Sequence, residues 1–329
     1  MLSPYRILDL TDHRGGMAGY ILGSLGAEIV LVESAQGSAA RSRPPLASNG
    51  TSLEWWAQRR GAKSVQVSSH EELLELVAGA DALIESPDQG AGLSTEELHA
   101  INPSLVHTTI TAFGSTGPKA DWLASDLIIG AAGCSMAVTG DSDRAPLRTT
   151  TPQSWLHAGG QAASGTALAL RERSISGLGQ HVDVAAQQAM LQNAFPGVIL
   201  APNDNPQTER TSGGILALNY HLQFVYPAAD GFVSITLLFG RTIGRFTDRL
   251  MEWVCEAGFC DAALRDLGWV DFGTRLFMEP EGPGELELAK AAISAFTKSK
   301  TKAELFVGAQ EREVLLAPVA RIDEMLDME

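Results

Sequence analysis

The chain has 329 residues, a length that allows two domains of ordinary size or one large α/β domain with a smaller companion. Hydrophobic residues make up 45% of the sequence and charged residues 19%, a composition typical of a folded globular protein rather than a disordered one. The formal net charge of −15 argues against nucleic acid or an anionic membrane as a partner, because no basic surplus neutralises phosphates.

The cysteines and the first residues indicate the compartment. Cys134, Cys255 and Cys260 have neither the spacing of a zinc site nor that of a disulfide framework, so we expect no metal site and a reducing environment. The N-terminus leads into a strand without a charged and apolar leader, and no apolar run reaches membrane length. We therefore expect a cytoplasmic protein.

The N-terminal residues predict a βαβ unit with a glycine-rich turn. The strand, turn, helix and second strand are expected at residues 6–10, 11–16, 17–25 and 27–33. The turn contains His13 and Arg14 and presents backbone N–H groups at the positive end of the helix, where a phosphate binds favourably. Glu33 stands where dinucleotide folds place their ribose-binding acid, but the glycines read G-G-x-x-G, an incomplete fingerprint.

Basic side chains gather in the next segment. Arg41 lies in a polar loop, and Arg60 and Lys63 follow a short helix that contains two tryptophans. These residues form either an anion-binding surface or a solvated basic turn. The βαβ alternation then continues, with strands expected at residues 64–67, 82–85 and 105–112 and a helix at residues 71–77.

A long central helix is predicted between Thr151 and Gly177. Thr151 followed by Pro152 suits the start of a helix, and Gly177 suits its end. Small residues recur along it at Gly159, Gly160, Ala162, Ala163, Gly165, Ala167 and Ala169. The backbone of this helix can therefore press closely against neighbouring elements. A short strand at 181–185 and a further helix through 187–191 follow.

The C-terminal part predicts a second, smaller α+β domain. A segment rich in Pro, Asn, Asp and Thr indicates a linker before it. The expected boundaries are 1–200 for the large domain, 201–224 for the linker, 225–320 for the small domain and 321–329 for a C-terminal segment. Asp230-Gly231 predicts a hairpin, and helices are expected at residues 241–257, 285–297 and 301–310.

Three motifs resemble the family III CoA-transferases, which include formyl-CoA transferase, carnitine CoA-transferase and α-methylacyl-CoA racemase. The first runs from an Arg-x-Arg pair through Gly-Leu-Gly-Gln to Val-Asp-Val, at residues 171–184. The second is Phe-Gly-x-x-Gly-Pro at residues 113–118, and the third is Ala-Pro-Val at residues 317–319. The resemblance covers roughly the whole chain.

The resemblance implies a Rossmann-like large domain, a smaller α+β domain and an interlocked dimer. It implies acyl-CoA and carboxylic acid substrates, with CoA or acyl-CoA as a ligand and no tightly bound cofactor. The candidates for CoA binding are His13, Arg14, Arg41, Arg60 and Lys63. Gly213 and Gly214 are candidates for the mobile glycine loop that covers the family's active site, although a plain turn also fits. Residues 321–329 would then be a truncated form of the family's C-terminal return segment.

The resemblance also implies which position of this chain corresponds to the family's catalytic aspartate. In the family, an aspartate carboxylate attacks the acyl thioester and forms a mixed anhydride. Counting back from Gly177 places that position at Trp155, and an indole cannot attack a thioester, so we assign no catalytic residue. Ser154 with His157 as its base is an alternative, without a third orienting group. Ser125 stands where the racemases need an acid–base histidine, which disfavours racemization.

Three functions remain to be distinguished. The favoured one is a nucleophile-lacking subunit of a CoA-transferase, in a dimer with a homologous subunit that carries the aspartate or with a second copy of itself. An alternative is a non-catalytic CoA-ester-binding or assembly protein. The third is an NAD-dependent oxidoreductase that uses Glu33, which the two glycine motifs disfavour.

Overall fold

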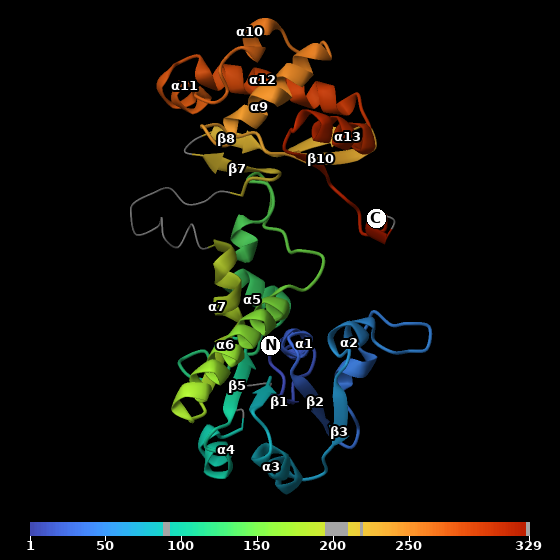
Figure 1. Cartoon of the computed structure of the whole chain (residues 1–329), viewed down its shortest axis with the longest axis vertical. Coiled ribbons are helices and arrows are strands. Elements are labelled where there is room, and N and C mark those ends of the chain that lie inside the picture. The colour runs from blue at the N-terminus through green and yellow to red at the C-terminus, as the bar shows by residue number, and fades with distance from the viewer. Residues whose placement is uncertain (88–92, 195–209, 218–219, 327–329) are drawn as a thin grey trace. The chain divides into compact units, whose positions relative to one another are not determined.

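The computed structural model describes residues 1–87, 93–194, 210–217 and 220–326, and the chain divides into two compact units (Figure 1). Unit 1 comprises Met1–Thr139 and Pro146–Thr208, and unit 2 comprises Gly140–Ala145 and Glu209–Glu329. Among the described residues, no helix is long and apolar enough to cross a membrane. Two units were expected, but the grouping of residues 140–145 with unit 2 differs from the continuous domain predicted for residues 1–200.

Unit 1 is an α/β fold with six parallel strands in the order β3-β2-β1-β4-β5-β6. The strands are β1 (Arg6–Asp9), β2 (Glu28–Glu33), β3 (Lys63–Gln66), β4 (Ala82–Glu85), β5 (Val106–Thr111) and β6 (His181–Ala185). The α-helices are α1 (Gly16–Ser24), α2 (Leu53–Gln58), α3 (His70–Ala78), α4 (Thr95–Ile101), α5 (Asp126–Ala132), α6 (Ser154–Ser176) and α7 (Ala186–Leu191). Short 3-10 turns are η1 (Ala39–Ser42), η2 (Ser135–Val138) and η3 (Gln192–Ala194). The predicted parallel α/β architecture is confirmed.

Both faces of this sheet are covered, because alternate strand residues point to opposite sides. Ile7 and Ile84 pack with α1 and α6 in one apolar cluster. Leu8 and Leu83 pack with α3 and α4 in another cluster on the other face. The sheet is therefore the middle layer of three, and its carboxyl edge is where the loops after β1, β2 and β4 emerge.

Helix α6 packs against α1 with almost no side chain between the two backbones. A Cβ added to Gly159 would lie 2.8 Å from the Cβ of Met17 and 3.1 Å from the amide nitrogen of Ala18. The prediction of close backbone packing is confirmed. Gly177 ends the helix with φ +76°, also as predicted.

The start of α6 differs from the prediction at Thr151 and Pro152, because the helix begins at Ser154. The carboxylate of Asp126 caps it from another helix, accepting the amide hydrogens of Gln153 and Ser154 at 2.9 and 2.8 Å. A distant carboxylate therefore satisfies the free N–H groups that a local side chain was expected to satisfy.

Unit 2 contains a three-stranded antiparallel sheet, a two-stranded sheet and a group of helices. Its strands are β7 (Gly214–Ala217), β8 (Tyr220–Gln223), β9 (Val225–Ala228), β10 (Gly231–Ile235) and β11 (Leu316–Pro318). Its helices are α9 (Gly244–Glu256), α10 (Ala262–Arg265), α11 (Phe272–Met278), α12 (Gly282–Lys298) and α13 (Lys302–Arg312), with the 3-10 turn η5 (Glu324–Leu326). The predicted hairpin at Asp230-Gly231 is the β9–β10 pair.

Part of the predicted linker is folded. Residues 201–209 and 218–219 lie outside the described residues, but β7 and β8 pair within the range 201–224. The segment 140–145 is held in the same unit by Arg210, whose guanidinium donates to the carbonyl oxygens of Asp141 and Arg144 at 3.1 and 2.8 Å. The range predicted as a linker, 201–224, therefore includes a pair of strands, whereas most of its polar segment lies outside the described residues.

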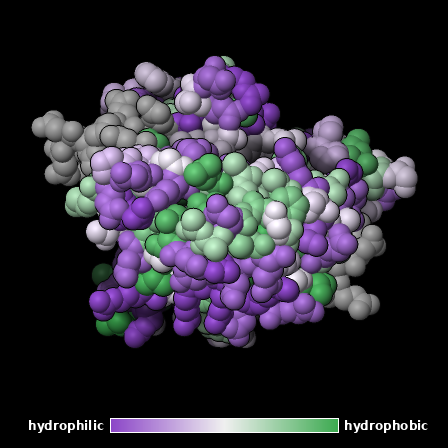
Figure 2. All heavy atoms as spheres, turned by 90° about the horizontal axis from the view of Figure 1, so that it is seen from above, coloured by the Kyte–Doolittle hydropathy of each residue, from purple (hydrophilic) through white to green (hydrophobic). Residues whose placement is uncertain are grey.

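The helices of unit 2 leave apolar side chains at the surface. Figure 2 shows apolar side chains gathered in the middle of the face seen from above, surrounded by polar ones. Leu288, Ala291 and Ala295 are exposed at helical spacing on α12. The outer side of this helix is therefore partly apolar, although its inner side supplies Ile293 and Phe296 to the core.

Replacing Gly159 with alanine is expected to destabilise unit 1 by about 1–3 kcal/mol, the usual penalty for overpacking. The matched control is Gly160→Ala on the same helix, where an added Cβ meets no atom within 4 Å. Because alanine favours a helix over glycine by about 1 kcal/mol, this control is expected to be neutral or stabilising. Urea denaturation followed by circular dichroism measures both variants, and equal loss in the two would contradict the close packing of α1 and α6.

Candidate functional site

The turn after β1 is fixed by a buried guanidinium. The Arg59 side chain is 4% exposed and forms an ion pair with the fully buried carboxylate of Asp9. Its other terminal nitrogen, Nη2, donates to the carbonyl oxygens of Thr11 and Asp12 at 2.8 and 2.9 Å. Thr11 in turn donates its amide and hydroxyl hydrogens to Asp9 Oδ1. These bonds determine the path of the chain from β1 to α1.

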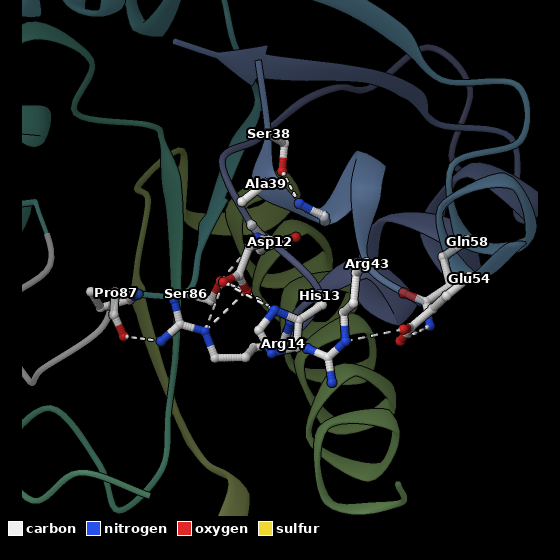
Figure 3. A network of polar contacts seen from close by, with 12 residues as sticks. Asp12, His13, Arg14, Ser38, Ala39, Arg43, Glu54, Gln58, Ser86 and Pro87 are labelled. Carbon is white, nitrogen blue, oxygen red and sulfur yellow. Dashed lines mark hydrogen bonds and ion pairs between the residues drawn. The ribbon is translucent and has the colours of Figure 1, made fainter. Parts of the chain in front are cut away.

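A second polar network follows at the carboxyl edge of the sheet, with Asp12, His13 and Arg14 close together and Ser86 and Pro87 beside them (Figure 3). Asp12 accepts hydrogen bonds from the amide of Arg14 at 2.8 Å and from its Nε at 3.0 Å, and His13 Nδ1 lies 3.3 Å from its carboxylate. Although burial opposes it, hydrogen bonding to His13 and Arg14 holds the pKa of Asp12 well below its usual value. Arg14 also donates to the carbonyl oxygen of Pro87 at 3.1 Å.

Helix α1 begins at this network. Its N-cap is Gly15, which offers no side-chain cap, and its first turn contains no acidic residue. A Cβ on Gly15 would collide with the Thr11 side chain at 2.4 Å, so the tight turn requires glycine. The predicted arrangement of a strand, a glycine-rich turn and an uncapped helix start is therefore present at His13 and Arg14.

Arg41 approaches the same edge from the loop after β2. Its guanidinium binds Glu33 with two hydrogen bonds of 2.6 and 2.8 Å and lies 4.4 Å from the centre of the Trp55 ring. Ser64 and the amide of Ser38 also donate to Glu33. Hydrogen bonding to Arg41, despite burial, lowers the pKa of Glu33 to about 2. Both oxygens of Glu33 are occupied, which argues against a ribose-binding role.

The remaining basic candidates lie elsewhere. Arg60 donates to the hydroxyl of Tyr20 at 2.8 Å and covers its ring. Lys63 is the first residue of β3, 72% exposed, and pairs with Glu28, the first residue of β2, at 2.5 Å. Lys63 therefore lies at the amino edge of the sheet. The structure brings His13, Arg14 and the Arg41 loop together at the carboxyl edge and does not bring Lys63 to them.

The two candidate loop glycines lie in unit 2. Gly213 has φ +68°, and its carbonyl oxygen accepts the amide hydrogens of Phe224 and Val225 at 2.7 and 2.9 Å. Gly214 is the first residue of β7, where a Cβ would lie 2.2 Å from the carbonyl oxygen of Leu222. Both residues are thus tied to β8 and β9, and their role in covering a site stays a prediction.

Trp155 lies in the first turn of α6, half-buried and packed against the core of unit 1. Ser154 is buried, and its hydroxyl donates to the carbonyl oxygen of Asp126 at 3.1 Å, so it is part of the helix start. His157 faces an open groove of about 590 Å³ that also contacts Met17 and Ile21 of α1. The Ser154 hydroxyl is therefore engaged with Asp126, which gives no support to Ser154 as a nucleophile with His157 as its base.

A small cavity at the start of α6 was not predicted. It measures about 100 Å³ and lies among Leu147, Met136 and Met190, with Asp126 and Arg148 on its polar side. Arg148 Nε lies 3.5 Å from Asp126 Oδ2. Asp126 is the first residue of α5, and its contact with α6 has no local sequence pattern that predicts it. Among the described residues, no cluster of His, Cys, Asp or Glu has the arrangement of a metal site.

The fold agrees with that of a solved relative. The crystal structure of a CAIB/BAIF family protein from Brucella suis has a TM-score of 0.76 at 24% identity, covering 99% of this chain and 85% of that one. At this identity the likeness concerns the fold alone. It supports the arrangement of strands and helices described above.

Sequence comparisons show the family in addition to the fold. Subunit BbsE of succinyl-CoA:(R)-benzylsuccinate CoA-transferase from Thauera aromatica is 30% identical over 335 residues, which cover 97% of this chain and 78% of that protein. Succinate–glutarate CoA-transferase from Agrobacterium fabrum is 28% identical over 344 residues, with 98% and 81% covered. The family model for CoA-transferase family III matches residues 2–329. The chain therefore belongs to CoA-transferase family III.

Proposed function

We propose that this chain is the nucleophile-lacking subunit of a CoA-transferase built from two homologous chains, acting on acyl-CoA and carboxylic acid substrates. The observation that carries the proposal is Trp155 in the first turn of α6, where the family's aspartate is expected. Acyl exchange through an anhydride needs a carboxylate that serves as both nucleophile and leaving group. An indole has neither property, so a homologous partner would supply the aspartate.

The surroundings of Trp155 support its reading as a structural residue. The ring packs against the apolar core of unit 1, and the helix start is closed by Asp126. The carboxylate of Asp126 lies at the same helix start, but Oδ1 accepts two backbone amides and Oδ2 faces Arg148. We therefore assign Asp126 to capping α6 and not to attack on a thioester.

The carboxyl edge of the sheet is the proposed binding surface for the phosphates of CoA. His13, Arg14 and Arg41 approach it from two loops, and the uncapped start of α1 adds backbone N–H groups. Basic side chains are needed there because the protein as a whole has a net charge of −15, and Arg14 and Arg41 are held in place by ion pairs with Asp12 and Glu33. Within the proposal, binding and assembly are the contributions of this chain, and the partner contributes the covalent chemistry.

The proposal extends to an interlocked dimer with a homologous chain. One similar protein from Thauera aromatica is by name a subunit of a CoA-transferase, which supports an assembly of different chains. A chain that keeps the family scaffold from residue 2 to residue 329 but lacks the nucleophile fits such an assembly.

His13→Gln and Arg41→Gln are each expected to weaken CoA binding about tenfold, since each removes one charge-assisted contact worth roughly 1.4 kcal/mol. Lys63→Gln at the amino edge is the matched control and is expected to leave the dissociation constant unchanged. Isothermal titration calorimetry with CoA measures all three, with circular dichroism as the check on folding. Equal losses at Lys63 and Arg41 would show that the phosphates bind elsewhere.

The purified chain alone is expected to have no transferase activity, and activity is expected to appear when a homologous chain with an intact aspartate is added. Chromatographic detection of the product CoA ester measures it, with succinyl-CoA as one donor. Activity of the chain alone would refute the proposal. CoA binding without activity in either arrangement would instead identify a non-catalytic CoA-ester-binding protein.

Trp155→Asp is expected to create transferase activity in the chain alone, because it restores a carboxylate in the first turn of α6. Trp155→Asn is the matched control, since it has the same size and no nucleophilic oxygen. The same product assay compares the two variants over several acyl-CoA donors. An inactive Asp variant that still binds CoA would show that the pocket has lost more than its nucleophile.

A further inference from the structure

The chain reverses direction at the end of α9. Gly258 has φ +83°, and its amide donates to the carbonyl oxygen of Cys255 at 2.9 Å. The amide of Phe259 donates to the carbonyl oxygen of Val254 at 3.1 Å. These two bonds form a Schellman motif, which returns the chain over the last turn of the helix. Phe259 then packs edge-on against Phe296, with ring centres 5.8 Å apart.

This reversal brings two cysteines together. The sulfur of Cys260 lies 3.7 Å from the carbonyl oxygen of Met251. Met251 is one helical turn before Cys255, so both lie on the same face of α9. In an α-helix the carbonyl oxygen of Met251 points toward Cys255, the residue one turn later, so the Cys260 sulfur lies beside the Cys255 position. Both residues are half-buried, which leaves the pair within reach of a small reagent.

We propose that Cys255 and Cys260 are a redox pair that a hydroperoxide converts reversibly to a disulfide. This modification site is in unit 2 and is independent of the proposed acyl transfer. It needs no partner chain and no CoA.

The reaction balances in two steps. The thiolate of one cysteine attacks a peroxide oxygen, the O–O bond breaks, and the departing hydroxide takes a proton to become water. The resulting sulfenic acid is attacked by the second sulfur, the S–S bond forms, and its hydroxyl leaves with the second thiol's proton as another water. Two thiols are oxidised, and one hydroperoxide is reduced to water and the corresponding alcohol or a second water.

The order of attack follows from the surroundings of the two sulfurs. Burial, and after it the neighbouring Cys255 side chain, raises the pKa of the Cys260 thiol well above its usual value. Cys260 therefore stays protonated near neutral pH and is a poor first nucleophile. Cys255 is the attacking residue, and Cys260 is the residue that resolves the sulfenic acid.

The experiment treats the reduced full-length chain with hydrogen peroxide and counts thiols with a chromogenic disulfide reagent. The thiol count is expected to fall from three to one, because Cys134 lies in unit 1 and takes no part. Intact mass is expected to fall by two hydrogens, and a peptide map is expected to link Cys255 to Cys260. Dithiothreitol restores all three thiols. Cys134→Ser is the matched control and is expected to lose both of its remaining thiols.

Two variants test the order of attack. In Cys260→Ser the sulfenic acid at Cys255 has no resolving partner, so dimedone is expected to label Cys255. In Cys255→Ser, Cys260 is expected to stay unlabelled at the same peroxide concentration. The proposal is wrong if the wild-type chain keeps three thiols, if the disulfide includes Cys134, or if dimedone labels Cys260 as fast as Cys255. The wild-type peptide map decides the pairing even if a variant fails to fold.

Discussion

The ion pair between Arg59 and Asp9 is the interaction on which the proposed site depends. It lies at the end of β1, out of contact with water, and it is accompanied by hydrogen bonds from the same guanidinium to Thr11 and Asp12. Removing one partner of such a buried pair costs about 3–5 kcal/mol, because the other charge is left without compensation. The pair therefore imposes one path on the chain between β1 and α1. That path places His13 and Arg14, and it also sets where α1 begins.

Helix α1 in turn determines the position of α6. The two helices meet at Gly159 with their backbones almost in contact, so α6 cannot move far without displacing α1. Trp155 lies one turn before Gly159 on the same helix. The proposed binding surface and Trp155 are thus positioned by the same pair of closely packed helices.

Much of the fold follows from local patterns. Strands and helices alternate as the apolar periodicity predicts, Gly177 ends the central helix, and Asp230-Gly231 forms the hairpin. Contacts between residues far apart in the sequence could not be predicted from these local patterns. Asp126 caps α6 from another helix, and no neighbouring residue of Thr151 reveals this. The range predicted as a linker, 201–224, likewise did not anticipate the pairing of β7 with β8.

The candidate site shows the same limit. Residues 59–63 contain three basic side chains close together in sequence, yet Arg59 is buried while Lys63 lies at the opposite edge of the sheet. The difference arises because Arg59 reaches inward to Asp9, whereas Lys63 already belongs to β3. Residue type alone predicted the charge of this segment. Only the topology of the sheet separates structural cations from those available to a ligand.

The grouping of residues 140–145 with unit 2 has a consequence for synthesis on the ribosome. The chain leaves unit 1 at Thr139, enters the other unit for a few residues and then returns to make α6 and β6. A nascent chain that ends at residue 139 has neither the edge strand β6 nor the helix that covers β5. Unit 1 therefore completes its core only after β6 has emerged from the ribosome. Residues 140–145 are synthesised earlier, but their hydrogen bonds with Arg210 form only after Arg210 has been translated.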